Sequence, residues 1–333
     1  MNKRHFIHVG YGKAGSSALQ CNFFPKCKEI YFYGITWDTS QDGEVSNGRF
    51  LSDSGRRIVQ QIVYPEFFDK FLENDIRDLE YHKKISDDKN KAFVLSNDHL
   101  TLLVAPEWSI QKLKDLFPDG KIIITLRRQQ DIIKSLYKYK GCELLYVPKK
   151  YKYSYVSFNE WFDYAYFNYN NRGGHKARDW VADYLRIIDF KRMIDFYGNV
   201  FGFDNIHVLL YEELINNPEL FYRKLLNILG AEGGTDCICS FQNKIINKSQ
   251  STARLQYISL KSKLFGNYLF SEHIPGARYI SKLIHNVLDK YNSTSIDIND
   301  EQRKILVDIY GKGNKEISNK FGLHLEDYGY YVT

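Results

Sequence analysis

The chain has 333 residues, of which 44% are hydrophobic and 26% charged, and its 46 Lys and Arg residues exceed its 40 Asp and Glu residues to give a net charge of +6. This composition is typical of a globular protein and excludes disordered, collagen-like and low-complexity classes. A chain of this length buries a core without disulfides or structural metals. The mild positive charge favours anionic ligands without requiring nucleic acid.

No segment approaches the roughly 20 apolar residues of a membrane-spanning helix. The apolar run at residues 6–10 is too short for the hydrophobic part of a secretory signal. The five cysteines are odd in number and form no CxxC pair, which predicts neither a disulfide framework nor a zinc ribbon. We therefore expect a cytoplasmic protein without an integral membrane segment.

Four short runs rich in β-branched and aromatic residues predict buried strands, at residues 5–9, 92–96, 121–126 and 206–210. Helical patterns separate the strands. Three helices have clear signals in the sequence, at residues 15–24, at 218–229 and from residue 300 onward. Strands that alternate with helices predict an α/β fold with a central parallel sheet flanked by helices, and ligands at the carboxyl ends of the strands. We expect a single domain, residues 1–333, with loop insertions near 38–56 and 141–157.

A glycine-rich turn, GYGKAGSS at residues 10–17, follows the first predicted strand and opens into a helix. Its backbone N–H groups, the helix N-terminus, the Ser16 and Ser17 hydroxyls and the Lys13 charge can act on one anion. Gly10 and Gly15 have the spacing of the nucleotide P-loop GxxxxGK[ST], but Ser16 stands where that motif has lysine. A glycine-rich turn without a ligand is the alternative, although its place directly after the first strand favours a phosphate cradle.

A second candidate anchor follows the predicted strand at residues 121–126. Arg127 ends this strand, and Ser135 follows eight residues later on a predicted helix. An arginine and a serine so placed can hold one phosphate from two sides. The alternative is that Arg127 and Arg128 are solvated residues at the start of a helix.

These motifs resemble those of the sulfotransferases that use 3′-phosphoadenosine 5′-phosphosulfate (PAPS). The Lys-x-Gly-Ser-Ser order at residues 13–17 is similar to the family's 5′-phosphosulfate loop, where Lys-x-Gly-Thr-Thr is usual. Arg127 and Ser135 match its 3′-phosphate site, and Tyr-Glu-Glu-Leu at 211–214 resembles a motif of its bacterial and carbohydrate-modifying members. The resemblance runs in pieces from the first strand to about residue 323.

The resemblance implies a P-loop-like three-layer fold, PAPS as cofactor with its bisphosphate PAP as product, and no metal. The residues that it assigns to cofactor binding are Lys13, Ala14, Gly15, Ser16, Ser17, Arg127 and Ser135. Lys13 and the N–H groups of the loop are also expected to neutralise charge on the bridging and leaving oxygens.

An acid and an imidazole follow the predicted strand at residues 92–96. Transfer to an alcohol needs a base near its hydroxyl group. Asp98 falls where carbohydrate sulfotransferases often carry a glutamate that is regarded as the base, and we favour Asp98 for this reason. His99 is the alternative, because an imidazole serves as base in cytosolic members of the superfamily. Helix capping by Asp98 and a structural hydrogen bond of His99 are the non-catalytic alternatives.

We therefore expect in-line transfer of a sulfuryl group from PAPS to a hydroxyl of a carbohydrate acceptor, which would be a glycan, polysaccharide or glycolipid. Basic, Tyr-rich segments at 138–140, 149–153 and 171–176 are candidate acceptor-binding loops, and solvated loops would look the same. The alternatives are a P-loop kinase and a non-catalytic protein that binds glycans or polyanions. No nucleic-acid partner is expected, and the sequence leaves the acceptor and the oligomeric state open.

Overall fold

The computed structural model describes residues 4–39, 45–64, 71–103, 106–138, 155–171, 184–234, 251–265, 277–291 and 296–333. The chain divides into two compact units. The first unit comprises Met1–Arg128, Asp189–Lys248 and Tyr310–Thr333, and the second comprises Gln129–Ile188 and Ser249–Ile309. The single domain expected from the sequence stays a prediction.

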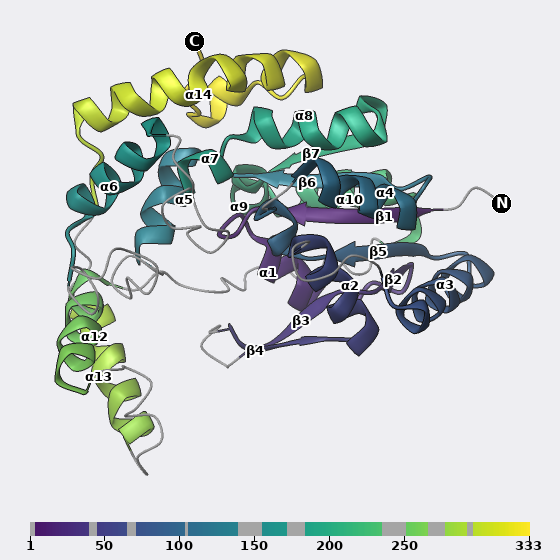
Figure 1. The fold of residues 1–333 in the computed structure, drawn as a ribbon, viewed down its shortest axis with the longest axis horizontal. Helices are drawn as coiled ribbons and strands as arrows, with labels where there is room; N and C mark the ends of the chain where they lie inside the picture. Colours follow the sequence, from purple (N-terminus) through teal and green to yellow (C-terminus); the bar gives the residue numbers. More distant parts are fainter. Residues whose placement is uncertain are drawn as a thin grey trace. The chain divides into compact units, whose positions relative to one another are not determined.

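A five-stranded parallel sheet forms the centre of the first unit (Figure 1). Its strands, in spatial order, are β2 (Ile30–Phe32), β5 (Ala92–Ser96), β1 (His5–Gly10), β6 (Lys121–Leu126) and β7 (Ile206–Leu210). The four strands expected from the sequence are confirmed, and β2 was missed. Side chains on both faces of the central strands are buried, as a parallel sheet covered on both sides requires.

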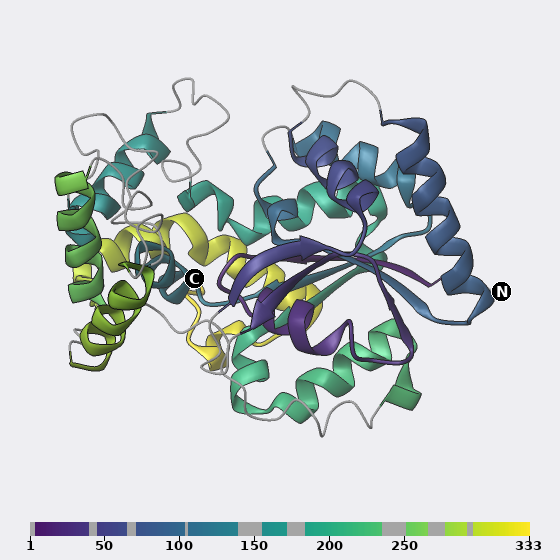
Figure 2. The same cartoon turned by 90° about the horizontal axis from the view of Figure 1, so that it is seen from below.

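Helices cover the two faces of this sheet (Figure 2). One face carries α1 (Ser16–Ala18), the π-helical turn η1 (Leu19–Phe23) and α10 (Pro218–Leu229), which share a core that includes Phe6, Phe23 and Leu225. The other face carries α2 (Asp53–Val63), α3 (Glu73–Asp88), α4 (Pro106–Leu116) and α8 (Phe190–Phe201). The expected three-layer α/β architecture is confirmed.

The helix starts expected from the sequence are also present. Asn217 caps α10, because its Oδ1 accepts a hydrogen bond of 3.2 Å from the N–H of Leu220. α14 (Asp300–Phe321) begins where its acidic first turn predicted. It continues through Gly311, where a Cβ would lie 2.4 Å from Thr333 Oγ1, so glycine permits the C-terminus to pack there.

The expected loop near residues 38–56 is wrong in part. It contains β4 (Val45–Phe50), which pairs antiparallel with β3 (Ile35–Thr39), and the beginning of α2. β4 has no alternation of apolar and polar residues and pairs only within this hairpin, so its sequence gave no strand signal. Residues 141–154 of the other expected insertion lie outside the described residues.

The second unit is helical in its described parts. Its helices are α5 (Gln129–Leu136), α6 (Phe158–Asn170), α7 (Tyr184–Ile187), α12 (Thr252–Phe265), α13 (Ala277–Tyr291) and the first part of α14. Trp161 stacks on Tyr184 with ring centroids 4.3 Å apart, which joins α6 to α7. No helix in the described ranges is both long and apolar enough to cross a membrane.

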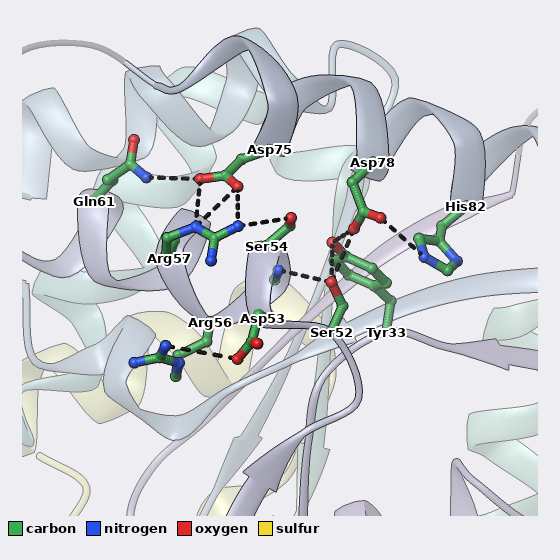
Figure 3. A network of polar contacts seen from close by, with 11 residues as sticks. Tyr33, Ser52, Asp53, Ser54, Arg56, Arg57, Gln61, Asp75, Asp78 and His82 are labelled. Atoms are coloured by element: carbon green, nitrogen blue, oxygen red, sulfur yellow. Dashed lines mark hydrogen bonds and ion pairs between the residues drawn. The ribbon is translucent and has the colours of Figure 1, made fainter.

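An ion pair with a buried carboxylate joins α2 to α3 in the first unit (Figure 3). Arg57 Nη2 lies 2.6 Å from Oδ1 of Asp75, whose side chain is fully buried. Burial alone would raise the pKa of the Asp75 carboxyl, but the hydrogen bonds from Arg57 bring this pKa below its ordinary value. The charged form of Asp75 therefore stabilises the fold above its ordinary pKa, and this contribution is lost as the pH falls.

We predict that Arg57→Leu lowers the melting temperature at neutral pH by several degrees, because it leaves a buried carboxylate without its cation. The deficit relative to wild type should narrow as the pH falls through the ordinary range of an aspartate. Calorimetry at several pH values measures both effects.

The matched control is the neighbouring Arg56→Leu. Arg56 pairs at 3.6 Å with Asp53, whose side chain is 84% exposed, and such a surface pair contributes little. An equal loss of melting temperature in the two variants would contradict a stabilising role of the Arg57–Asp75 pair.

Candidate functional site

The turn after β1 has an unusual backbone. Lys13 and Gly15 both have positive φ, 71° and 86°, and the N–H of Ala14 donates to the Tyr11 carbonyl at 3.0 Å. The left-handed region costs a residue with a side chain about 1–2 kcal/mol, whereas glycine adopts it freely. A Cβ on Gly15 would also lie 3.0 Å from Cδ2 of Tyr211, so glycine lets this turn pack against the end of β7.

The side chain of Ser16 forms a hydrogen bond within the turn. Its Oγ donates to the Tyr11 carbonyl at 3.2 Å and the side chain is buried. A Cβ on Gly10 would lie 2.0 Å from this Oγ, which explains why the turn needs glycine there. Ser17 is half-buried. The Ser16 hydroxyl, expected to serve an anion, therefore bonds the backbone of its own loop in this structure.

Arg127 connects the end of β6 to this turn. Its Nη1 donates to the Lys13 carbonyl at 2.6 Å, and its guanidinium lies 4.6 Å from the centre of the Tyr211 ring. Its Nε is buried and has no hydrogen-bond partner among the described residues. A guanidinium has five N–H donors, so Arg127 can hold the loop and an anion at once.

Two residues of this site were assigned only a scaffold role from the sequence. Tyr211, on α9 (Tyr211–Asn216), supplies the ring that contacts the Arg127 guanidinium and also packs against Gly15. Glu212, which is 8% exposed, accepts hydrogen bonds from the N–H of Arg128 at 3.0 Å and from the Tyr330 hydroxyl at 2.8 Å. The position of the Tyr-Glu-Glu-Leu motif directly after a strand was the available signal.

The two candidate bases lie on η3 (Asp98–Thr101), which follows β5. The cap of this segment is Asn97, whose Oδ1 accepts from the N–H of His99 at 2.8 Å, so Asp98 does not have the capping role considered above. Asp98 is half-buried and His99 is exposed. A choice between them as base stays a prediction.

A cavity of about 480 Å³ lies beside η3 in the first unit. His99 and Asn97 line it, whereas Asp98 does not. The rest of the wall comes from the β3–β4 hairpin and α2: Ile35, Gly48, Arg49, Phe50, Asp53, Arg56, Val59, Gln60, Val63 and Tyr64. The cavity combines aromatic and apolar side chains with cations, and the sequence gave no sign of it.

Ser135 lies on α5 in the second unit and is buried. Its joint action with Arg127 stays a prediction, as do the ligand roles of Lys13, Ala14, Gly15 and Ser17. The basic, Tyr-rich segments lie outside the described residues except for Lys138 and Asn171. Among the described residues, no three His, Cys, Asp or Glu side chains are grouped so that they could hold a metal ion.

A chain of buried polar groups lies beside the turn. His8 on β1 is fully buried, with Nδ1 2.7 Å from Ser96 Oγ and Nε2 3.2 Å from Thr125 Oγ1. Gln20 donates to Ser96 at 3.1 Å and accepts from the Trp37 indole at 3.0 Å. Burial lowers the pKa of His8 to about 3, so the ring is neutral at neutral pH. A neutral ring with its proton on Nε2 satisfies both hydroxyls.

Comparison with known proteins adds to this description. No family model and no curated protein matches the chain. The chain is similar to sulfotransferases of known structure. The sulfotransferase from Alicyclobacillus acidocaldarius has 18% identity over 84% of this chain and 99% of that chain, with a TM-score of 0.46.

Two further structures show weaker similarity. The sulfotransferase domain of the Synechococcus PCC 7002 olefin synthase has 13% identity over 73% of this chain and 78% of that domain, with a TM-score of 0.41. The sulfotransferase domain of the curacin biosynthetic pathway has 13% identity over 93% of this chain and 98% of its own, with a TM-score of 0.36.

We predict that His8 makes the protein less stable as the pH falls from about 6.5 toward 3. In this interval the unfolded state binds a proton that the folded state excludes, and the effect is at most about 1.4 kcal/mol per pH unit. His8→Gln should flatten this part of the profile in urea unfolding. His99→Gln, at an exposed histidine, should retain it, and an unchanged slope in His8→Gln would contradict the prediction.

Proposed function

We propose that this protein transfers the sulfuryl group of PAPS to a hydroxyl of a carbohydrate acceptor. The observation that carries the proposal is the hydrogen bond from Arg127 to the Lys13 carbonyl, because it joins the two motifs that resemble the phosphosulfate loop and the 3′-phosphate site. The two motifs are 114 residues apart in the sequence, yet they meet at the carboxyl edge of the sheet.

The residues at this edge suit a nucleotide with two separate anionic groups. The Nε of Arg127 is a buried donor without a partner among the described residues, and an anion would offset the cost of its desolvation. Lys13 adds a full positive charge, and Ser17 and the loop N–H groups add neutral donors. In the proposed reaction, Arg127 and Ser135 hold the 3′-phosphate, and residues 13–17 hold the phosphosulfate end.

PAPS supplies the sulfuryl group, and adenosine 3′,5′-bisphosphate leaves. Lys13 neutralises negative charge that develops on the leaving oxygen. His99 accepts the proton of the acceptor hydroxyl, a role that its place on the cavity wall supports over Asp98. A histidine ring nitrogen is a common general base in such proton transfers.

The cavity beside η3 is the proposed acceptor site. Its volume is within the range of small-ligand pockets. Phe50 and Tyr64 offer aromatic faces for sugar rings, and Arg49 and Arg56 offer hydrogen-bond donors for hydroxyl or acidic groups.

The nucleotide part of the proposal is tested by calorimetric titration with adenosine 3′,5′-bisphosphate, with and without magnesium. We expect metal-independent binding that Arg127→Gln weakens by about tenfold or more, since a charged hydrogen bond contributes about 1.5–3 kcal/mol. Magnesium-dependent preference for ATP would instead support a kinase, and absence of nucleotide binding would overturn the proposal.

The role of Lys13 is tested with the variant Lys13→Gly. Glycine removes the backbone strain at this position but increases the entropy of the unfolded chain, so stability should stay within about 1 kcal/mol of wild type. Bisphosphate affinity should nevertheless fall, because the positive charge is lost. A stable Lys13→Gly protein with unchanged affinity would remove Lys13 from the site.

The base is tested with labelled PAPS and a panel of dextran, chondroitin and heparosan as acceptors. His99→Gln should abolish transfer while bisphosphate affinity stays unchanged, and Asp98→Asn should retain most of the activity. The reverse result would assign the base to Asp98.

A further inference from the structure

Helices α12 and α13 of the second unit lie side by side (Figures 1 and 2). Polar side chains join them: Lys261 Nζ donates to Ser281 Oγ at 3.0 Å, and the rings of Tyr257 and His285 are 5.7 Å apart. The side of α13 that meets α12 therefore carries Ser281 and His285.

The opposite side of α13 is apolar and exposed. It carries Tyr279, Ile280, Leu283 and Val287, which are 69%, 58%, 49% and 55% exposed. Their spacing places them on one side of a helix. A surface helix of a globular protein normally turns its apolar stripe toward the core, whereas this stripe of α13 is exposed.

α12 exposes two further apolar residues, Leu260 and Leu264, which lie four residues apart. These two helices thus contribute six of the fourteen large apolar side chains exposed in the described part of the chain. We call the four exposed residues of α13 the apolar face. Concentration of exposed apolar groups in one place marks an interaction surface.

The charge of the two helices indicates the kind of partner. They contain six Lys or Arg residues and a single Asp, which accounts for most of the net charge of the whole chain, +6. Lys263 of α12 is exposed. A second copy of this surface would bring like charges together, which opposes self-association.

We propose that the apolar face docks on the surface of an anionic lipid membrane. Helices of this kind lie in the plane of the interface, with apolar side chains at the boundary of the acyl chains and cations among the anionic headgroups. This proposal does not depend on the proposed enzymatic function, and it would hold the protein at a membrane surface.

Flotation of the full chain with lipid vesicles tests the proposal. The protein should float with vesicles that contain phosphatidylglycerol and remain below vesicles of pure phosphatidylcholine. Added salt should weaken the binding, because it screens the cations. A folded wild-type protein that does not bind the anionic vesicles would overturn the proposal.

Variants separate the apolar contribution to vesicle binding from the electrostatic contribution. The double variant Ile280→Gln and Leu283→Gln should reduce vesicle binding about tenfold or more. Lys263→Gln should reduce both the binding and its salt dependence. The control is Leu72→Gln, at a comparably exposed apolar residue of the first unit, which should bind like wild type.

Circular dichroism and bisphosphate titration establish that each variant is folded, and analytical ultracentrifugation gives its oligomeric state. Undiminished vesicle binding by the apolar double variant would overturn the proposal. A wild-type dimer that this variant dissociates would assign the apolar face to a second copy and would also overturn it.

Discussion

One hydrogen bond holds the ends of two neighbouring strands in the candidate site, from Arg127 Nη1 to the carbonyl of Lys13. The Tyr211 ring under the guanidinium adds the end of β7, and this ring also packs on Gly15. Glu212 fixes the next backbone N–H, that of Arg128, and ties it to Tyr330 near the C-terminus. Three strand ends and the C-terminal segment therefore depend on a small set of charged and aromatic contacts.

This arrangement offsets a local strain. The left-handed backbone of Lys13 costs about 1–2 kcal/mol, and a hydrogen bond from a charged group contributes about 1.5–3 kcal/mol, so the bond from Arg127 is sufficient to hold the conformation. Glycine would adopt the same backbone without cost. The lysine side chain at this position is therefore better explained by its charge than by the needs of the turn.

The sequence was sufficient to predict most of the central fold. Buried strands such as β6 are continuous apolar runs, and the start of α10 is specified by three adjacent residues. Both signals are therefore local in the sequence. The β3–β4 hairpin was missed because its strands pair only with each other and need no apolar alternation. The cavity beside η3 was missed for a related reason, since its wall combines residues of this hairpin with α2 and η3.

The residue types of the candidate site were predictable, whereas their bonding was not. Lys13 and Arg127 follow adjacent parallel strands, so their proximity follows from topology. The sequence could not show that Ser16 donates to the Tyr11 carbonyl, because that bond depends on the backbone angles of the turn. To bind an anion, the Ser16 hydroxyl must give up its hydrogen bond to this carbonyl. Arg127 loses no such bond, because its Nε donor lacks a partner among the described residues. The free-energy balance therefore favours Arg127 over Ser16 as the ligand of a phosphate.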